Sequence, residues 1–136
     1  MRAALLLPIL LFAGSVLADA NRARQNYLIH CMGCHGEAGL GLEGKVPSFR
    51  QTLARISTSP KGRDYVLRVP GVTQATLDDA KTAEVLNWVL AEFSSAEAAR
   101  RVAPFTADEV ARSRQRPLLE VTEARANATR VQLSAA

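Results

Sequence analysis

The sequence has few of the residues that build a large core. Its 136 residues include one tryptophan, two tyrosines, four phenylalanines, two methionines, two cysteines and two histidines. So few aromatic side chains predict a small core, whose missing centre a buried cofactor with a large apolar face would supply. No basic run is interleaved with aromatic residues, so the net charge of +4 does not indicate a nucleic-acid-binding protein.

Long apolar runs are also absent, except at the N-terminus. Met1-Arg2 supplies a positive charge, residues 3–12 are almost wholly apolar, and small residues lead to Ala18-Asp19-Ala20. This order predicts a secretory signal peptide over residues 1–20, and cleavage after Ala18 is the second choice. The apolar run is shorter than the roughly 20 residues of a spanning helix, which argues against a retained membrane anchor. We therefore expect an exported mature protein without a membrane span.

The two cysteines stand close together, and a histidine directly follows the second. Residues 31–35 read Cys-Met-Gly-Cys-His, the C-x-x-C-H pattern of covalent haem attachment. One helical turn places the two sulfurs under the two porphyrin vinyl groups, and the next residue carries its imidazole beneath the iron. The sequence therefore predicts one covalent haem c, attached through Cys31 and Cys34, with His35 as a ligand of the iron.

Three other interpretations of this segment stay open. A thioredoxin-like dithiol uses the same C-x-x-C pattern but requires βαβ surroundings, whereas the flanks here are glycine-rich and helical. A zinc site would need His30, Cys31, Cys34 and His35, which are near neighbours that point in different directions, and no second ligand pair exists. A structural disulfide is the third interpretation, because two cysteines of an exported protein often pair.

Apolar spacing, caps and glycines predict a series of helices. Residues 21–29 favour a helix that leads into the cysteines, and apolar residues at helical spacing favour another over 49–56. Ser59-Pro60 is a helix start, and Pro70-Gly71 ends that helix. Thr76, paired with Asp79, is expected to open the most clearly indicated helix of the chain, whose apolar face runs to Phe93. The glycine-rich residues 36–44 are expected to form a loop close to the haem.

Over residues 21–94 the chain resembles the class I c-type cytochromes. Tyr27 stands where that family has an aromatic residue before the first cysteine, and residues 31–39 resemble the family's C-x-x-C-H-G-x-x-G. Pro47 falls where family members have a proline whose carbonyl accepts the imidazole N–H of the iron ligand. Residues 77–90 resemble the C-terminal helix that crosses the first helix. The resemblance implies an all-α fold around one haem, with Pro47 supporting His35.

The family's usual second iron ligand, a methionine ahead of the last helix, is missing. Met1 lies in the expected signal peptide, and Met32 is held between the two cysteines on the side of His35. Residues 69–75 contain neither methionine nor histidine. The sixth iron position is therefore expected to be open, or to be filled by a nitrogen or oxygen donor. The candidates for such a donor are Lys45, Lys61 and Lys81.

Two functions follow from these features. The first is a single-electron carrier, not an enzyme, in the periplasm of a Gram-negative bacterium. Its partners would be redox proteins such as a dehydrogenase, a reductase or an oxidase. The second is a haem protein whose open iron position binds or senses a small ligand such as a gas.

Residues 95–136 form a basic C-terminal extension beyond the expected cytochrome domain. A capping box from Thr106 to Glu109 predicts a helix from Ala107 to about Ser113, and residues 121–131 keep a weak helical period. The extension is interpreted either as a strap on the cytochrome surface with a frayed end, or as a docking segment for an acidic redox partner.

Overall fold

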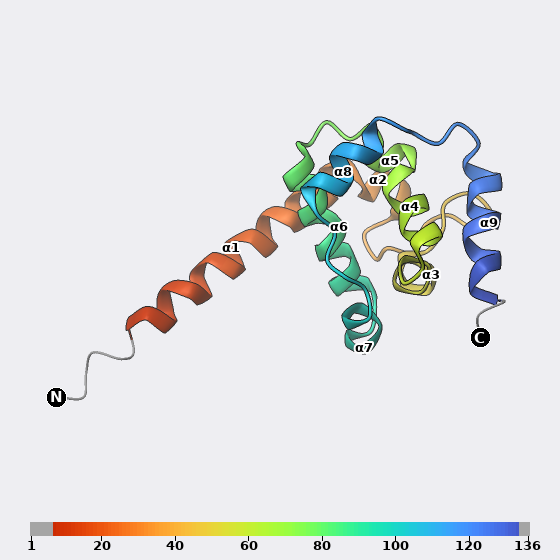
Figure 1. Ribbon diagram of the computed structural model, residues 1–136. Helices are drawn as coiled ribbons and strands as arrows, with labels where there is room; N and C mark the ends of the chain where they lie inside the picture. Colours follow the sequence, from red (N-terminus) through yellow and green to blue (C-terminus); the bar gives the residue numbers. More distant parts are fainter. Residues whose placement is uncertain (1–6, 134–136) are drawn as a thin grey trace.

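The computed structural model describes residues 7–133, and the side chains of residues 19–130 apart from Gln51. Residues 1–6, which begin the expected signal peptide, lie outside the described residues. Within the described range the chain is helical and has no β-strand (Figure 1), and its extended pairing is an isolated bridge between Leu42 and Val46. The predicted all-α fold is confirmed.

Most of the described helices are short. In chain order the described helices are α1 (Leu7–His30), α2 (Met32–His35), α3 (Phe49–Ser57), α4 (Pro60–Arg68), α5 (Pro70–Thr73), α6 (Asp79–Phe93), α7 (Ala96–Arg100), α8 (Ala107–Arg114) and α9 (Val121–Leu133). The helix α6 packs against α1, α3, α7 and α8. None of these helices is both long and apolar enough to cross a membrane. The expected cleavage position after residue 20 falls inside α1.

The packing of α1 against α6 forms an aromatic centre of the core. Tyr27 is only 1% exposed, and its ring centroid lies 5.2 Å from that of Trp88 and 5.4 Å from that of Phe93. A salt bridge between Arg22 and Glu84 joins the same two helices at the surface. This is the contact between the first helix and the helix over residues 77–90 that the resemblance implies.

Most helix starts are those expected from the capping residues, and one differs. The side chain of Ser59 accepts a hydrogen bond from Gly62 N at the start of α4, and Thr106 and Glu109 form the capping box of α8. The long helix α6 begins at Asp79, because Asp78 rather than Thr76 caps it by accepting a hydrogen bond from Lys81 N. Pro70 does not simply end α4, since it also begins the short helix α5.

Residues 95–133 contribute to the same core as the residues before them. Val110 of α8 is completely buried, and Phe105 is nearly so. The side-chain amide of Asn87 accepts a hydrogen bond from Phe105 N at 2.7 Å and donates one to Phe105 O at 2.9 Å, which ties the segment before α8 to α6. The last helix, α9, packs on α3 and α4 at the side of the molecule opposite α1 (Figure 1).

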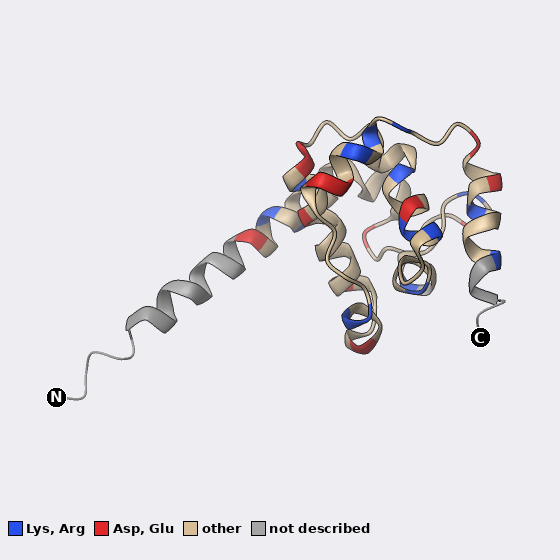
Figure 2. Cartoon of the chain, in the orientation of Figure 1, with Lys and Arg blue, Asp and Glu red and all other residues tan. Residues whose placement is uncertain are grey.

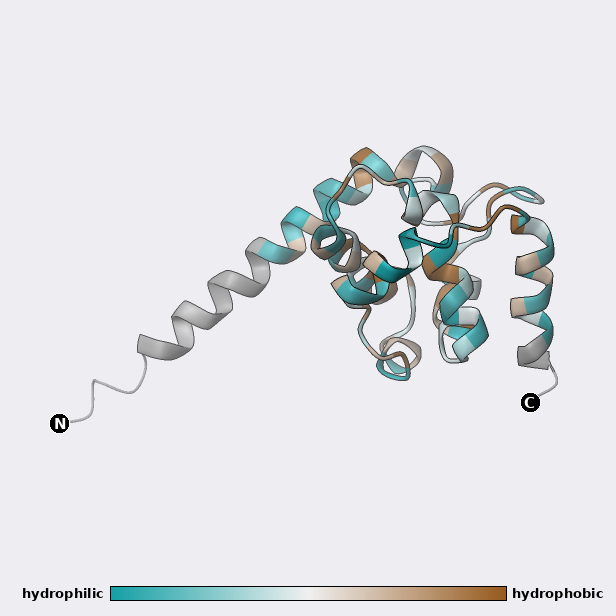
Figure 3. Cartoon of the chain, turned by 45° about the horizontal axis from the view of Figure 1, so that its top comes forward, coloured by the Kyte–Doolittle hydropathy of each residue, from teal (hydrophilic) through white to brown (hydrophobic). Residues whose placement is uncertain are grey.

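The surface of this C-terminal part is polar. Figure 2 shows Lys and Arg residues on α4, α8 and α9. Figure 3 shows that α9 carries few strongly hydrophobic residues along its described length. Its contacts with the body are made by the small Ala128, which is buried, and by the half-buried Val121, Ala124 and Arg125.

Candidate haem site

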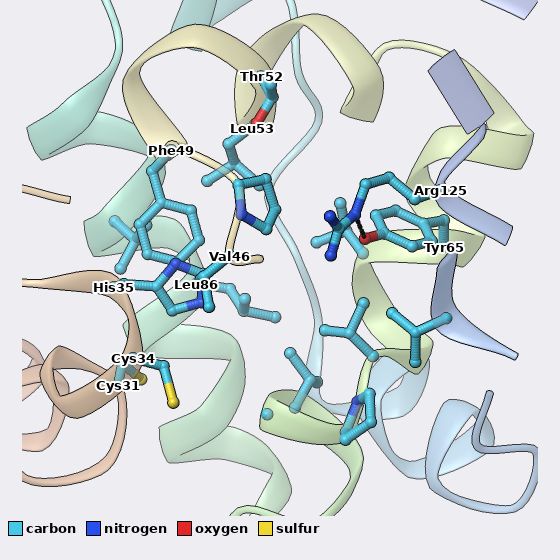
Figure 4. A pocket seen from close by; sticks show the side chains of 18 of the residues that line it. Cys31, Cys34, His35, Val46, Phe49, Thr52, Leu53, Tyr65, Leu86 and Arg125 are labelled. Carbon is cyan, nitrogen blue, oxygen red and sulfur yellow. Dashed lines mark hydrogen bonds between the residues drawn. The ribbon is translucent and has the colours of Figure 1, made fainter. Parts of the chain in front are cut away.

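A cavity of about 270 Å³ lies between α2, the loop over residues 40–47, and helices α3 to α6 and α9. Its walls are mainly aliphatic. Cys31, Cys34 and His35 lie on one side of it, and Tyr65 and Arg125 lie across from them (Figure 4). The main apolar lining residues are Val46, Leu53, Ile56, Val66, Val69, Val72, Val85, Leu86, Val89 and Val121.

One turn of helix brings the two thiols and the imidazole to the cavity. Cys31 precedes α2, and its carbonyl accepts hydrogen bonds from Cys34 N at 3.2 Å and from His35 N at 3.1 Å. The hydroxyl of Tyr27 donates a hydrogen bond to Gly36 O, which fixes the end of this turn against α1. Cys31, Cys34 and His35, which are close in sequence, therefore also lie together at the cavity wall.

The chemistry of the two cysteines argues against the alternative interpretations. Burial, and secondly the neighbouring Cys34, raise the pKa of the Cys31 thiol to about 11. A redox-active dithiol requires a lowered thiol pKa, and the βαβ surroundings of such a site do not occur within residues 7–133. Both thiols are free, so the structure contains no disulfide between them.

The zinc interpretation is not supported either. Nowhere in the described part of the chain do three His, Cys, Asp or Glu side chains converge as metal ligands would. His30 also lines the cavity and is half-buried, but it does not join His35 in a cluster of metal-binding side chains. The residues of the C-x-x-C-H segment are therefore not arranged to bind a bare metal ion, and they border a cavity that could hold a larger group.

His35 is half-buried, in a form suited to binding a metal. Burial lowers the pKa of its imidazole, whereas the backbone carbonyl of Pro47 acts to raise it, and the net direction is downward. The neutral ring is the form that ligates iron. Nδ1 of His35 is buried without a hydrogen-bond partner among the described residues, and the ring stacks on Phe49 at 3.8 Å between centroids.

A tight loop brings Pro47 back to His35. Gly41 N donates a hydrogen bond to His35 O at 2.8 Å, and Val46 pairs with Leu42. Gly41 has a φ of +72°, and a Cβ there would lie 2.2 Å from Val46 O, so only glycine fits. Pro47 lines the cavity and its carbonyl acts on the His35 ring, but the assignment of Pro47 as a haem-supporting residue stays a prediction.

The cavity lining also includes residues of the segment 69–75, in which the resemblance leads one to expect a methionine. Val69, Pro70, Gly71 and Val72 line this part of the cavity, and none of them has a side chain that can bind iron. Met32 is not a lining residue. Of the three lysines proposed as donors, Lys45 lines the cavity, whereas Lys61 and Lys81 do not, and Lys81 pairs with Asp78 at 2.8 Å.

Two polar lining residues were not predicted from the sequence. Arg125 of α9 donates a hydrogen bond from Nε to the hydroxyl of Tyr65 at 3.2 Å, and from Nη2 to Lys45 O at 3.2 Å (Figure 4). A signal was present, because Arg125 lies on the same helical face as Val121 and Ala128, at spacings of four and three residues. That face points inward.

These residues fit a covalently attached haem. Two free thiols and a half-buried imidazole share one wall, the carbonyl of Pro47 acts on that imidazole, and the remaining walls offer apolar surface. Thiols at this spacing can each form a thioether with a vinyl group, and the imidazole can supply one axial nitrogen.

Known proteins with similar sequences support this chemistry. Over 131 residues the chain is 30% identical to a cytochrome c-552 of Thermus thermophilus, and the match covers 83% of this chain and 87% of that protein. A second cytochrome c-552 from Thermus thermophilus is 30% identical over 106 residues, which are 65% of this chain and 81% of that protein. No protein-family model and no solved structure matches the chain. The chain belongs to the c-type cytochromes, whose cofactor is covalently bound haem c with its iron.

Proposed function

We propose that this c-type cytochrome is a monohaem electron carrier, attached to its haem through Cys31 and Cys34 and with His35 as the axial ligand. One observation carries the proposal. The two free thiols and the half-buried imidazole of His35 meet at one wall of an apolar cavity, and no other described group there offers a competing chemistry. The similarity to two proteins named cytochrome c-552 supports the same conclusion.

The bound haem would supply a one-electron couple between ferric and ferrous iron. The chain's own residues would hold and tune it. The aliphatic walls exclude water from the cavity, and burial keeps His35 neutral. Pro47 would orient the imidazole through its carbonyl, which would increase the basicity of the ligand. Cys34 is exposed, so the porphyrin edge beside it would be the edge through which electrons enter and leave.

The proposed setting is the periplasm of a Gram-negative bacterium. Residues 1–20 would direct export, residues 21–94 would form the cytochrome domain, and residues 95–136 would be its C-terminal extension. The protein would exchange electrons with a periplasmic dehydrogenase, reductase or oxidase rather than convert a substrate itself. The order of charge, apolar run and small residues at the N-terminus supports the export step.

A second function is favoured by one observation, the lack of a sulfur or imidazole donor in the segment 69–72 of the cavity lining. Its lining residues are Val69, Pro70, Gly71 and Val72. An iron with His35 alone would have an open sixth position, which could bind a small ligand such as carbon monoxide or nitric oxide. A donor such as Lys45 at that position would instead block the ligand.

The first test is haem attachment. The full chain is produced in a bacterial host with haem-maturation machinery, and covalent haem is measured by absorbance and by the mass of the denatured protein. We expect one haem per chain in the wild type, a single thioether in Cys34→Ala, and no attachment in the double variant Cys31→Ala/Cys34→Ala. A colourless wild-type protein with freely alkylated cysteines would refute the proposal.

The second test separates carrier from ligand-binding protein. Spectra of the ferrous protein are recorded with and without carbon monoxide, and electron exchange with a small redox mediator is followed by stopped flow. Fast exchange and an unchanged spectrum support the carrier with a filled sixth position. A shifted spectrum at micromolar carbon monoxide supports the open site.

A further inference from the structure

We propose that Arg125 of α9 forms an ion pair with a haem propionate, so that the C-terminal helix is part of the haem-binding site. This inference rests on the proposed haem attachment. It assigns a role to a helix that lies outside residues 21–94, where the sequence motifs resemble those of the class I cytochromes.

The charges at the cavity point to an anionic group within it. Its lining includes two cationic side chains, Lys45 and Arg125, and no Asp or Glu. Haem c carries two propionate carboxylates, and a carboxylate in an apolar cavity requires a cation or several hydrogen-bond donors beside it. A guanidinium is the side chain best suited to this, because its planar donors match the two carboxylate oxygens.

Arg125 differs from most of the other arginines whose side chains make contacts within the described residues. Six of them pair with a carboxylate, namely Arg22, Arg63, Arg68, Arg101, Arg114 and Arg116. Arg50 donates a hydrogen bond to Ala38 O, but it is exposed and does not line the cavity. Among the described residues Arg125 has no carboxylate partner, although it is half-buried and lines the cavity. Its hydrogen bonds to Tyr65 and to Lys45 O, both 3.2 Å long, go to neutral groups. The guanidinium is thus held in place while its charge is uncompensated.

The position of Arg125 agrees with the geometry of a porphyrin attached at residues 31 and 34. The vinyl groups and the propionates leave opposite edges of the macrocycle, so the propionates must point away from the cysteines. Arg125 and Tyr65 lie on the side of the cavity across from Cys31 and Cys34 (Figure 4). Arg125 also connects two walls of the cavity. It bonds to Lys45 O in the loop that leads to Pro47, and to the hydroxyl of Tyr65 in α4.

Tyr65 would assist in the same site. Its ring is buried, and its hydroxyl is directed into the cavity beside the guanidinium (Figure 4). By accepting the hydrogen bond from Arg125 Nε, the oxygen keeps its own proton available for donation to a carboxylate. Arg125 and Tyr65 would thus offer a propionate one cation and one neutral hydrogen-bond donor, side by side.

The experiment compares Arg125→Gln with the matched variant Arg112→Gln in the full-length holoprotein. Arg112 is exposed on α8 and does not line the cavity, so the second variant loses the same charge without touching the site. Haem content, the reduction potential and the redox-difference infrared bands of the propionate carboxylates are measured for both. Loss of a cation beside the haem destabilises the reduced, more negative form, so the potential should fall in Arg125→Gln and change little in Arg112→Gln.

The infrared bands provide the readout that a merely structural role would not change. We expect the carboxylate bands to shift in Arg125→Gln, to shift less in Arg125→Lys, which keeps the charge, and to shift slightly in Tyr65→Phe. Unchanged bands together with equal potentials in Arg125→Gln and Arg112→Gln would overturn the inference. If Arg125→Gln fails to retain haem, Arg125→Lys and Tyr65→Phe decide by the same two measurements.

Failure of this inference can be told apart from failure of the proposed function. A wild-type protein without covalent haem refutes the proposed function, and the comparison of variants is then void. A haem-loaded wild type whose potential and propionate bands are unaffected at position 125 refutes only the role of Arg125. A changed carbon monoxide spectrum in Arg125→Gln with unchanged propionate bands also overturns it, because Arg125 would then act on the iron's open side.

Discussion

The chain before residue 95 and the chain after it are held in the fold by different kinds of interaction. Residues before 95 are held by aromatic packing, in which Tyr27, Trp88 and Phe93 meet between α1 and α6. Residues after 95 bury fewer aromatic side chains, chiefly Phe105, and add directional polar contacts to their apolar packing. Arg63 donates hydrogen bonds to Glu109, to Ala103 O and to Pro104 O, and its guanidinium lies 4.3 Å from the ring centroid of Phe105.

This difference bears on the role of the arginines in the C-terminal extension. From the sequence, the basic extension is as compatible with a docking surface as with a strap. In the structure Arg114 donates hydrogen bonds to Leu77 O and to the Thr82 hydroxyl, while Arg68 of α4 donates one to Arg116 O. Several arginines therefore hold the C-terminal extension against the helices that precede it. Aromatic packing tolerates pH and salt, whereas charged contacts respond to both.

The largest effect is expected at the aromatic centre. Tyr27→Ala should reduce the free energy of unfolding by about 3–5 kcal/mol, because it leaves a large cavity between α1 and α6. Tyr27→Phe, which loses only the hydrogen bond to Gly36 O, should cost about 1 kcal/mol. Urea unfolding of the two variants measures both values. Equal losses would show that this part, too, depends on polar contacts.

An intermediate effect is expected at Glu109. Hydrogen bonds from Arg63, and more weakly from Thr106, lower the pKa of this carboxyl to about 2. Because the folded-state pKa is depressed, its contribution is complete above the ordinary value near 4.5 and is lost as the pH falls toward 2. Glu109→Gln should cost about 1–3 kcal/mol at pH 7, and this difference should vanish between pH 4.5 and 2.

The matched control for Glu109 is Glu97→Gln. Glu97 forms an exposed pair with Arg101, and such pairs contribute less than about 1 kcal/mol. Urea unfolding at several pH values compares the two variants. A loss at Glu109 that persists unchanged at pH 2, or an equal loss at Glu97, would contradict the special role of the Arg63 contact.

The smallest effect is expected at the helix caps, where the two parts should not differ. Asp78→Ala at α6 and Thr106→Ala at α8 should each cost about 1 kcal/mol, because a cap is a local hydrogen bond. Thr76→Ala should cost almost nothing, since Thr76 is exposed and does not cap α6. Thermal unfolding ranks the three variants, and a Thr76 variant as unstable as Asp78→Ala would place the helix start at Thr76 after all.

The features that the sequence predicts well depend on neighbours within a few positions. The starts of α4 and α8 follow from Ser59 and Thr106, whose side chains bond to amides three residues later. The same reasoning misplaces the start of α6, because Thr76 and Asp78 are both suitable caps and only the folded backbone selects Asp78. The short helix α7, capped by Ser95, was not predicted.

The residues of the candidate site also divide into those that the local sequence predicts and those that it does not. Cys31, Cys34 and His35 are adjacent in the chain, so one helical turn is enough to group them, and the pattern reveals them at once. Arg125 reaches the cavity only because the chain passes along α6 and α8 and returns beside α4. No local pattern encodes that path. Only the inward face of α9, shared by Val121, Arg125 and Ala128, hinted at it.

The bridge between Arg125 and Lys45 has a consequence for biosynthesis. Its two ends are 80 residues apart, so a chain exported from its N-terminus would present the attachment segment before the helix that completes the cavity. An attachment enzyme would meet Cys31 and Cys34 on a chain whose pocket still lacks one side. Closure would then be the last step of maturation, and a chain truncated before α9 would keep its haem-attachment residues yet expose the cofactor's far edge to solvent.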